Sequence, residues 1–224
     1  MHLGILAGLQ SEARCLSGTL PGAHTIQFSG ARLDGARRAA RRLVDGGATH
    51  LLSFGLAGGL DPALAPGTLL LPGRLLTAGG TGIPVDTAWH ARAMALLGSL
   101  QPITAPMVGS DQAIATAADK AALFARTGAT AVDMESHVLA EAAPDLPLLI
   151  LRVVADSAGD ALPPAALAGI KADGSTDLAA VLGSVLRRPG QIPALLRLGK
   201  AAARAEATLR AAARLGGPTG FGLL

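Results

Sequence analysis

Short apolar runs alternate with amphipathic stretches along the first 160 residues of the chain. The runs predict buried strands at residues 2–7, 25–28, 50–54, 69–71, 103–108 and 148–156. Between them, apolar residues recur three and four positions apart, which predicts helices from about residue 11 and at 32–44, 87–97 and 117–126. Strands that alternate with helices indicate an α/β fold with a mainly parallel sheet covered on both faces.

The pattern changes after Pro163 to an Ala-rich region with predicted helices at residues 178–186 and 193–215. Its later part is basic, with one acid, Glu206, against Arg187, Arg188, Arg197, Lys200, Arg204, Arg210 and Arg214. Because no repeat or long linker interrupts the chain, we expect one domain over residues 1–224, with residues 187–215 as a basic C-terminal helical extension.

Composition narrows the class of protein further. The net charge is only +3, and Tyr is absent beside one Trp and four Phe, which argues against a nucleic-acid binder. A single Cys15 excludes an internal disulfide and suits a reducing cytoplasm. The N-terminus lacks a secretory signal, and no apolar run approaches the roughly 18 residues of a membrane span. We therefore expect a soluble, cytoplasmic protein.

Acidic residues end two of the apolar runs, a short one at 131–133 that also predicts a strand and the longer one at 148–156. Asp133 and Glu135 come where an apolar run meets the start of a helix, and Asp156 ends the later run 148–156. A carboxylate at the carboxyl end of a strand is costly to desolvate and tends to be kept for a ligand. The pattern predicts acid/base chemistry or sugar binding at this edge, beside a glycine-rich turn predicted at 55–59.

Five segments, read in order, resemble the purine nucleoside phosphorylase and methylthioadenosine/adenosylhomocysteine nucleosidase superfamily. They are Glu12, the GLAGG segment 55–59, VGSD at 108–111, VDMES at 132–136 and RVVAD at 152–156. Residues 132–138, 151–164 and 182–198 resemble most closely the hopanoid-associated phosphorylases, also described as adenosylhopane nucleosidases.

The resemblance implies a three-layer α/β sandwich with a mixed, partly barrel-like central sheet, usually in a homo-oligomer. It also implies cleavage of the bond between a purine and ribose without a cofactor, with phosphate as co-substrate if the reaction is phosphorolytic. The substrate would be adenosylhopane, a lipid that carries an adenosine head, and the products adenine and ribosylhopane or its phosphate. The alternative is a soluble purine nucleoside such as methylthioadenosine, adenosylhomocysteine or inosine.

Three acidic residues take catalytic or binding roles by this resemblance. Asp156 matches the residue that protonates the purine N7, for which it needs a raised pKa. Glu135 matches the acceptor for the ribose hydroxyls, and Glu12 matches the base that activates water. In phosphorolysis, a phosphate ion would be bound by hydrogen-bond donors, and the candidates are Arg14, Arg32, Arg37 and the backbone amides of 55–59. The sequence does not decide whether water or phosphate is the nucleophile.

Six further positions are predicted to bind substrate by the same resemblance: Asp133, Met134, Leu56, Gly58, Ala113 and Ile114. Leu56 stands where the methylthioadenosine enzymes carry Ser, and Ala113 replaces an aromatic residue beside adenine. Base contacts would then be aliphatic or come from Phe54, so ordinary methylthioadenosine is a weaker candidate substrate. Asp133 has a purely structural role as its alternative.

For several other features the sequence allows two interpretations. The 193–215 helix, apolar with a cationic fringe, predicts a peripheral contact with the inner membrane, or packing on its own domain or a second subunit. His137 is expected to be a packed or capping residue, and Trp89 and His90 either line the pocket or belong to the core. The five histidines show no metal-ligand spacing, so no metal is predicted. As an alternative to an enzyme, the protein could be a nucleoside-binding module without catalytic activity.

Overall fold

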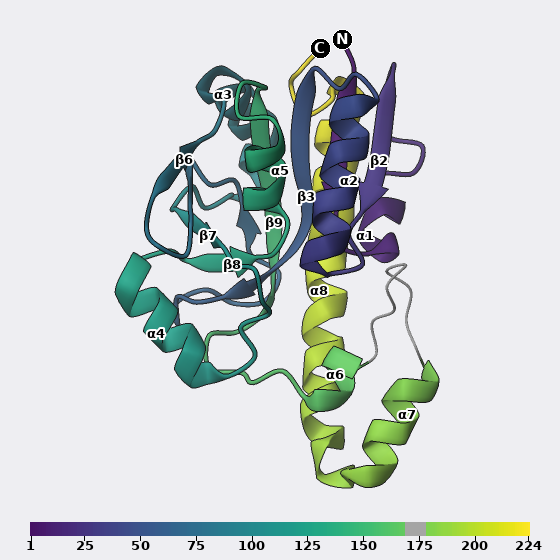
Figure 1. Ribbon diagram of the computed structural model, residues 1–224, viewed down its shortest axis with the longest axis vertical. Helices are drawn as coiled ribbons and strands as arrows, with labels where there is room; N and C mark the ends of the chain where they lie inside the picture. Colours follow the sequence, from purple (N-terminus) through teal and green to yellow (C-terminus); the bar gives the residue numbers. More distant parts are fainter. Residues whose placement is uncertain (169–177) are drawn as a thin grey trace.

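The computed structural model describes residues 1–168 and 178–224, which form a central sheet between layers of helices (Figure 1). The strands are β1 (Leu3–Ala7), β2 (His24–Phe28), β3 (His50–Gly59), β4 (Leu69–Leu70), β5 (Arg74–Leu76), β6 (Gly82–Pro84), β7 (Met107–Gly109), β8 (Ala131–Asp133) and β9 (Leu148–Asp156). The α-helices are α1 (Gln10–Arg14), α2 (Leu33–Asp45), α3 (Thr87–Leu97), α4 (Ala117–Thr127), α5 (Ser136–Ala142), α6 (Pro164–Ala168), α7 (Leu178–Arg187) and α8 (Ile192–Gly216). Single 3-10 turns lie at η1 (Gly98–Leu100), η2 (Pro189–Gln191) and η3 (Gly217–Thr219).

The sheet is mixed and mainly parallel. Its path runs β2-β1-β3-β8-β7-β5-β6, and β9 pairs with β3 and β4 away from this path. The pairs β3–β8, β4–β9 and β5–β6 are antiparallel, and the others are parallel. In β3, Gly58 is in register with Val132 of β8 and with Asp156 of β9. The ends of β8 and β9 therefore meet at one glycine.

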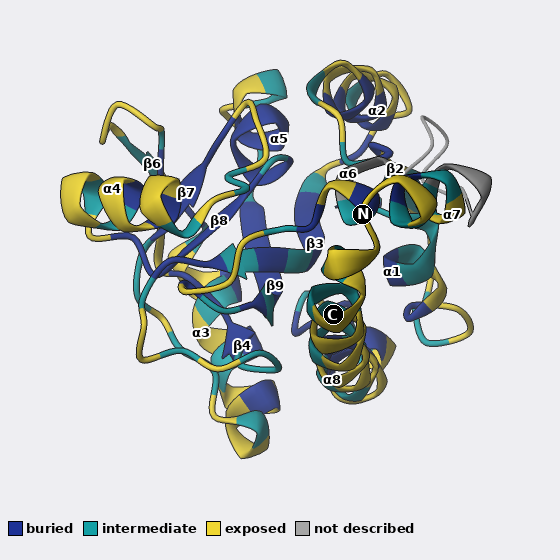
Figure 2. Ribbon diagram, turned by 90° about the horizontal axis from the view of Figure 1, so that it is seen from below, coloured by how far each residue is buried: buried dark blue, intermediate teal, exposed yellow. Residues whose placement is uncertain are grey.

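Helices cover both faces of the sheet because its strands are apolar on both sides (Figure 2). Leu52 and Phe54 of β3 face a core shared with the segment just after α1, with α3 and with the C-terminal half of α8. The preceding Leu51 faces a second core, shared with α2 and α5. A smaller third core around Leu123 lies under α4. The predicted α/β sandwich with a mixed sheet is confirmed.

Two of the predicted strand boundaries were wrong. Residues 55–59, predicted as a turn, continue β3. Residues 55–58 pair with β9, with a register shift between Ala57 and Gly58, and Gly59 pairs with Ala131 of β8. Residues 103–108 were predicted as one strand, but β7 begins only at Met107. Ile103 forms an isolated bridge with Leu70. Pro106, which lies between Ile103 and β7, has no N–H to donate to a neighbouring strand.

Candidate active site

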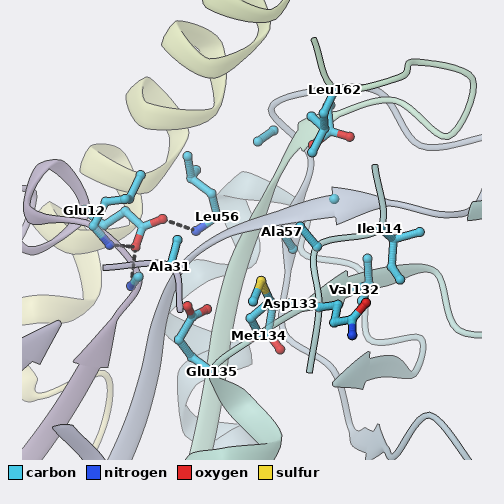
Figure 3. A pocket seen from close by; sticks show the side chains of 17 residues that line it. Glu12, Ala31, Leu56, Ala57, Ile114, Val132, Asp133, Met134, Glu135 and Leu162 are labelled. Carbon is cyan, nitrogen blue, oxygen red and sulfur yellow. Dashed lines mark hydrogen bonds between the residues drawn. The ribbon is translucent and has the colours of Figure 1, made fainter. Parts of the chain in front are cut away.

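A cavity of about 190 Å³ lies where the carboxyl ends of β3, β8 and β9 meet the loop after β1 (Figure 3). Every residue predicted for the site lines it: Glu12, Leu56, Gly58, Ala113, Ile114, Asp133, Met134, Glu135 and Asp156. In this view Glu12 lies on the left, Glu135 lies lower and nearer the centre, and Ile114 lies on the right. Residues far apart in the sequence are thus brought to one concave site, as expected at the strand ends of an α/β sheet.

Glu12 is held at the start of α1 by backbone donors. The N–H groups of Gly8 and Leu9 donate to its Oε2 at 2.6 and 2.9 Å, and that of Leu56 donates to Oε1 at 3.0 Å. Burial raises the pKa of Glu12 to about 7, although Arg152 and the N–H groups of Leu9 and Leu56 act in the opposite direction. Near neutral pH the group can therefore exchange a proton, as a general base must.

Gly55 leaves room for this arrangement. A Cβ at this position would lie 2.5 Å from Oε2 of Glu12 and 2.8 Å from Nη1 of Arg152. Any side chain would displace both charged groups, so the glycine-rich segment of β3 allows the backbone to approach the acid closely.

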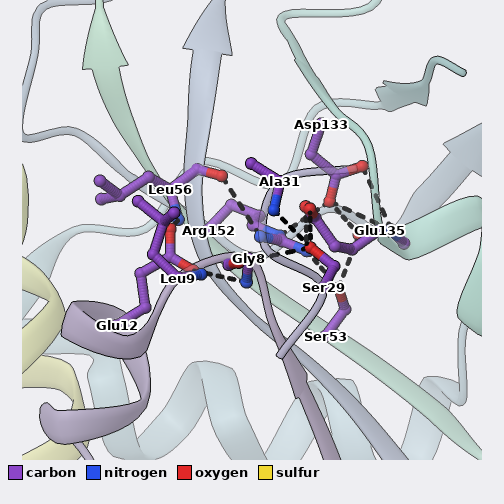
Figure 4. A network of polar contacts seen from close by, with 11 residues as sticks. Gly8, Leu9, Glu12, Ser29, Ala31, Ser53, Leu56, Asp133, Glu135 and Arg152 are labelled. Atoms are coloured by element: carbon purple, nitrogen blue, oxygen red, sulfur yellow. Dashed lines mark hydrogen bonds and ion pairs between the residues drawn. The ribbon is translucent and has the colours of Figure 1, made fainter. Parts of the chain in front are cut away.

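Arg152 connects the acids behind the cavity (Figure 4). Its guanidinium is fully buried in the middle of β9, with Nε 2.8 Å from Oδ2 of Asp133 and Nη2 3.4 Å from Oε2 of Glu135. It also donates to Oγ of Ser53 at 2.6 Å and to the carbonyl oxygen of Leu56 at 3.3 Å. A single cation thus offsets part of the charge of two buried carboxylates, and it also contacts the residue whose N–H binds Glu12.

Glu135 comes directly before α5 and is buried. Oγ of Ser29 donates to its Oε1 at 2.8 Å. Burial raises the pKa of Glu135, and the guanidinium of Arg152 opposes the rise. The side chain lines the cavity beside Met134, so it can accept hydrogen bonds from a bound hydroxylated ligand.

Asp133 has its oxygens engaged within the protein. Both lie 3.3 Å from the backbone N–H of Ser136, and Oγ of Ser136 also donates to Oδ2. With Arg152 on the same Oδ2, the carboxylate holds the start of α5 in place. These contacts favour the structural alternative for Asp133.

Asp156 ends β9 and is paired with a buried cation. Nζ of Lys120, from the first turn of α4, contacts its Oδ2. Burial raises the pKa of Asp156, while Lys120 acts to lower it. The carboxyl group lines the cavity next to Gly58, where a Cβ would lie only 3.6 Å from Oδ1.

Other candidate residues lie outside the cavity. Phe54, expected as a possible base contact, packs in the core with its ring 5.9 Å from that of Phe221, because it faces the α8 side of β3. Trp89 is buried and donates to the carbonyl oxygens of Gly220 and Phe221. His90 contacts the carbonyl oxygen of Leu71 at 2.9 Å. Neither residue lines the cavity, so base contacts there would be aliphatic.

Histidine and arginine candidates are also accounted for. His137 is buried, with Nε2 2.9 Å from Oδ1 of Asp111. Arg32 and Arg37 line a neighbouring groove that shares Met134 with the cavity, and Arg14 lines neither. In residues 1–168 and 178–224, no group of three His, Cys, Asp or Glu side chains is placed to hold a metal ion.

Sequence reasoning missed Arg152, Lys120 and Ser29. Arg152 had a signal, since it interrupts the otherwise apolar run 148–155. Lys120 had a weaker one, because it shares the buried face of its helix with Leu123 three positions later. Ser29 follows β2 and reaches Glu135 only through the fold, so the sequence offers no signal for it.

Comparison with known proteins identifies the family. The model of the phosphorylase superfamily matches residues 29–187, and the chain therefore belongs to this superfamily, as its motifs predicted. No curated protein was found to match the chain.

Solved structures share the fold at low sequence identity. A 5′-methylthioadenosine/S-adenosylhomocysteine nucleosidase from S. pneumoniae, solved with a transition-state inhibitor, has a TM-score of 0.70 at 17% identity and covers 96% of this chain and 99% of its own. The corresponding nucleosidase from Colwellia psychrerythraea, in complex with adenine, gives 0.68 at 17% identity, with 97% and 96% covered. Futalosine hydrolase of Helicobacter pylori strain 26695 gives 0.64 at 18% identity, with 84% and 97% covered.

Proposed function

We propose that the protein cleaves the N-glycosidic bond between a purine and ribose in this cavity. One observation carries the proposal: three buried carboxyl groups, from Glu12, Glu135 and Asp156, line a single cavity at the strand ends. Membership of the phosphorylase superfamily supports this reaction class, as do the nucleosidases among the proteins of similar fold.

Each carboxyl group meets a different demand of the reaction. Breaking the bond leaves negative charge on the base and positive charge on the sugar, and the site must stabilise both. Asp156 donates a proton to the base nitrogen N7. Glu135 accepts hydrogen bonds from the ribose hydroxyls and faces the cationic sugar. Glu12 orients the attacking nucleophile and takes its proton.

Water is the nucleophile that the cavity favours. Glu12, with its pKa near 7, is suited to deprotonate water. A phosphate ion would need cationic or backbone donors. In the described part of the chain no Lys or Arg lines the cavity, and the N–H of Leu56 already donates to Glu12. Arg32 and Arg37 of the neighbouring groove are the nearest candidates for a phosphorolytic alternative.

Adenosylhopane is the substrate that we propose, with adenine and ribosylhopane as the products. The resemblance of residues 132–138, 151–164 and 182–198 to hopanoid-associated enzymes supports it. So do Leu9, Leu56 and Leu162, which give the cavity an apolar lining for the part of the substrate beyond the ribose. The alternative remains a soluble nucleoside such as methylthioadenosine, adenosylhomocysteine or inosine.

Purified protein in phosphate-free buffer should release adenine from adenosylhopane, with chromatographic detection of the free base. Parallel reactions with methylthioadenosine, adenosylhomocysteine, inosine and futalosine test the soluble alternatives. Release that requires added phosphate would refute water as the nucleophile. Turnover of a soluble nucleoside alone would refute the lipid substrate, and no base release from any of them would refute the reaction class.

The basic C-terminal region divides into two parts. The later half of α8 is a core helix, with Ala205, Leu209 and Ala213 buried against β9. The earlier half projects with α7 beyond the sheet (Figure 1). Among the side chains of this α7–α8 tip that the structure describes, four large apolar ones are exposed: Leu182, Leu186, Ile192 and Leu196.

The charges of the tip fit an anionic bilayer surface. No acidic residue occurs between Asp177 and Glu206, whereas Arg187, Arg188, Arg197 and Lys200 are exposed there. Apolar side chains beside cations are the combination that places a helix at the lipid interface. We therefore propose that the protein acts in the cytoplasm, bound peripherally to the inner membrane through this tip. In the described part of the chain, no helix is both long and apolar enough to span a bilayer.

Co-sedimentation with vesicles tests this contact. The full chain should bind vesicles that contain phosphatidylglycerol, and less so at high salt, since exposed charges are screened. A double variant, Leu186→Ser with Leu196→Ser, should lose most of this binding, whereas Leu96→Ser on α3 should not. Equal binding of all three would refute the contact.

Light scattering of the same proteins tests the proposed homo-oligomer, and loss of oligomers only in the double variant would assign the tip to a subunit interface.

A further inference from the structure

Lys120 is a buried cation that does not line the cavity. Its side chain is 1% exposed, although lysines are rarely buried to this degree. Besides the contact with Asp156, Nζ donates to the carbonyl oxygens of Ser157 at 2.8 Å and Asp160 at 2.9 Å. Three oxygen partners match the three N–H donors of an ammonium group. All hydrogen-bond donors of the Lys120 ammonium group are therefore used at the end of β9 and in the loop that follows it.

This contact restricts how Asp156 can be presented to a ligand. Oδ2 is occupied by Lys120, whereas no hydrogen bond to Oδ1 occurs among the described residues. The same ammonium group holds two carbonyls of the following loop, so the carboxyl group and the loop are fixed together. One oxygen therefore remains for the cavity, in a defined orientation.

We propose that Lys120 is the positioning residue for the Asp156 acid: it orients the carboxyl group and stabilises the carboxylate that remains after proton transfer. The inference rests on the proposed function. In the step concerned, the Asp156 O–H bond breaks and an N7–H bond forms. The bond from the sugar carbon to the base nitrogen breaks, and its electron pair goes to the base. Water adds to the sugar and its proton passes to Glu12. Glu12 then releases this proton to solvent, and solvent returns a proton to Asp156.

The ammonium group favours this step because it attracts a carboxylate more strongly than a neutral acid. The contact strengthens as the proton leaves, which is the condition for lowering the barrier. Other charges near Asp156 do not replace it. Asp160 acts to raise the pKa of Asp156, Gly58 of β3 carries no charge, and Asp133 and Glu135 across the cavity are paired with Arg152.

Removal of the Lys120 cation should change the pKa of Asp156, and with it the pH dependence of the rate, in a predictable direction. Burial alone would raise the pKa of Asp156 further, so the alkaline limb of the rate profile should move to higher pH. In Lys120→Met we expect kcat for adenine release to fall at least about tenfold and this limb to move up by about one pH unit or more. KM should change little. Lys120→Arg should restore the limb, and Arg126→Met, on the exposed side of the same helix, should match the wild type.

Two further measurements separate a positioning role from a merely structural one. The double variant Lys120→Met with Asp156→Asn leaves no unpaired buried charge, and it should be no slower than Asp156→Asn alone. Carbon NMR of labelled aspartate, with the Asp156 signal assigned by its loss in Asp156→Asn, reports its titration without any substrate. An unchanged titration in folded Lys120→Met, or additive rate effects in the double variant, would overturn the inference. If the wild type releases no base, the proposed function fails while the NMR titration still decides the role of Lys120.

Discussion

Asp156→Asn is expected to slow adenine release by at least about a hundredfold at neutral pH, the usual scale of general acid catalysis. The amide is close in size to the carboxyl group and keeps an oxygen that can face Lys120, so the change removes mainly the acidic proton. Loss should appear in kcat as well as in kcat/KM, because the proton is transferred only as the bond breaks. Single-turnover kinetics with adenine detected directly would measure it.

A matched variant makes the result specific. Asp145→Asn changes an exposed aspartate in the loop before β9, and it should keep the wild-type rate. A nucleoside whose base leaves readily without protonation should be cleaved by Asp156→Asn nearly as fast as by the wild type. If Asp156→Asn released adenine at the normal rate, Asp156 would not be the acid, whatever the fate of the other assignments.

The sequence predicted the fold because its strand and helix patterns are strong and agree with one another. Apolar runs such as 148–156 are unambiguous, and the acids that follow them fall at the carboxyl end of the sheet. The nine predicted residues line one cavity because Gly58 of β3 is in register both with Val132 of β8 and with Asp156 at the end of β9. That convergence follows from topology, and the motifs reveal it only by resemblance to a known family.

The partners of the acids were not predictable in the same way. Arg152 and Lys120 are distant in sequence from the carboxylates that they neutralise, and a single charge in an apolar run has several structural meanings. The strand at 55–59 was missed because glycines normally signal a turn, whereas here they admit Glu12 and Arg152 against the backbone. Local pattern does not record such tertiary contacts.

Glu12→Gln is the other change with a large expected effect. Hydrolysis needs the ionised base, and the pKa of Glu12 is about 7, so kcat/KM of the wild type should rise with pH through about 7 before it falls along the alkaline limb set by Asp156. The variant should lose about a hundredfold or more of the activity, together with this rising limb. Glu141→Gln, an exposed glutamate on α5, should keep both the rate and the limb.

The same shifted group predicts how stability depends on pH. The pKa of Glu12 rises from its ordinary value of 4.5 to about 7 on folding, so the native state binds more protons than the unfolded chain between these values. The contribution of Glu12 to stability is full below pH 4.5 and is lost as pH rises through about 7. The free energy of unfolding in urea should therefore fall more steeply between pH 5 and 8 in the wild type than in Glu12→Gln. Identical slopes would mean that Glu12 is already ionised at pH 5, and the protein would then lack a base poised near neutrality. The rise in activity and the loss of stability over one pH range would have a single cause, the burial of a carboxyl group that must lose its proton to work.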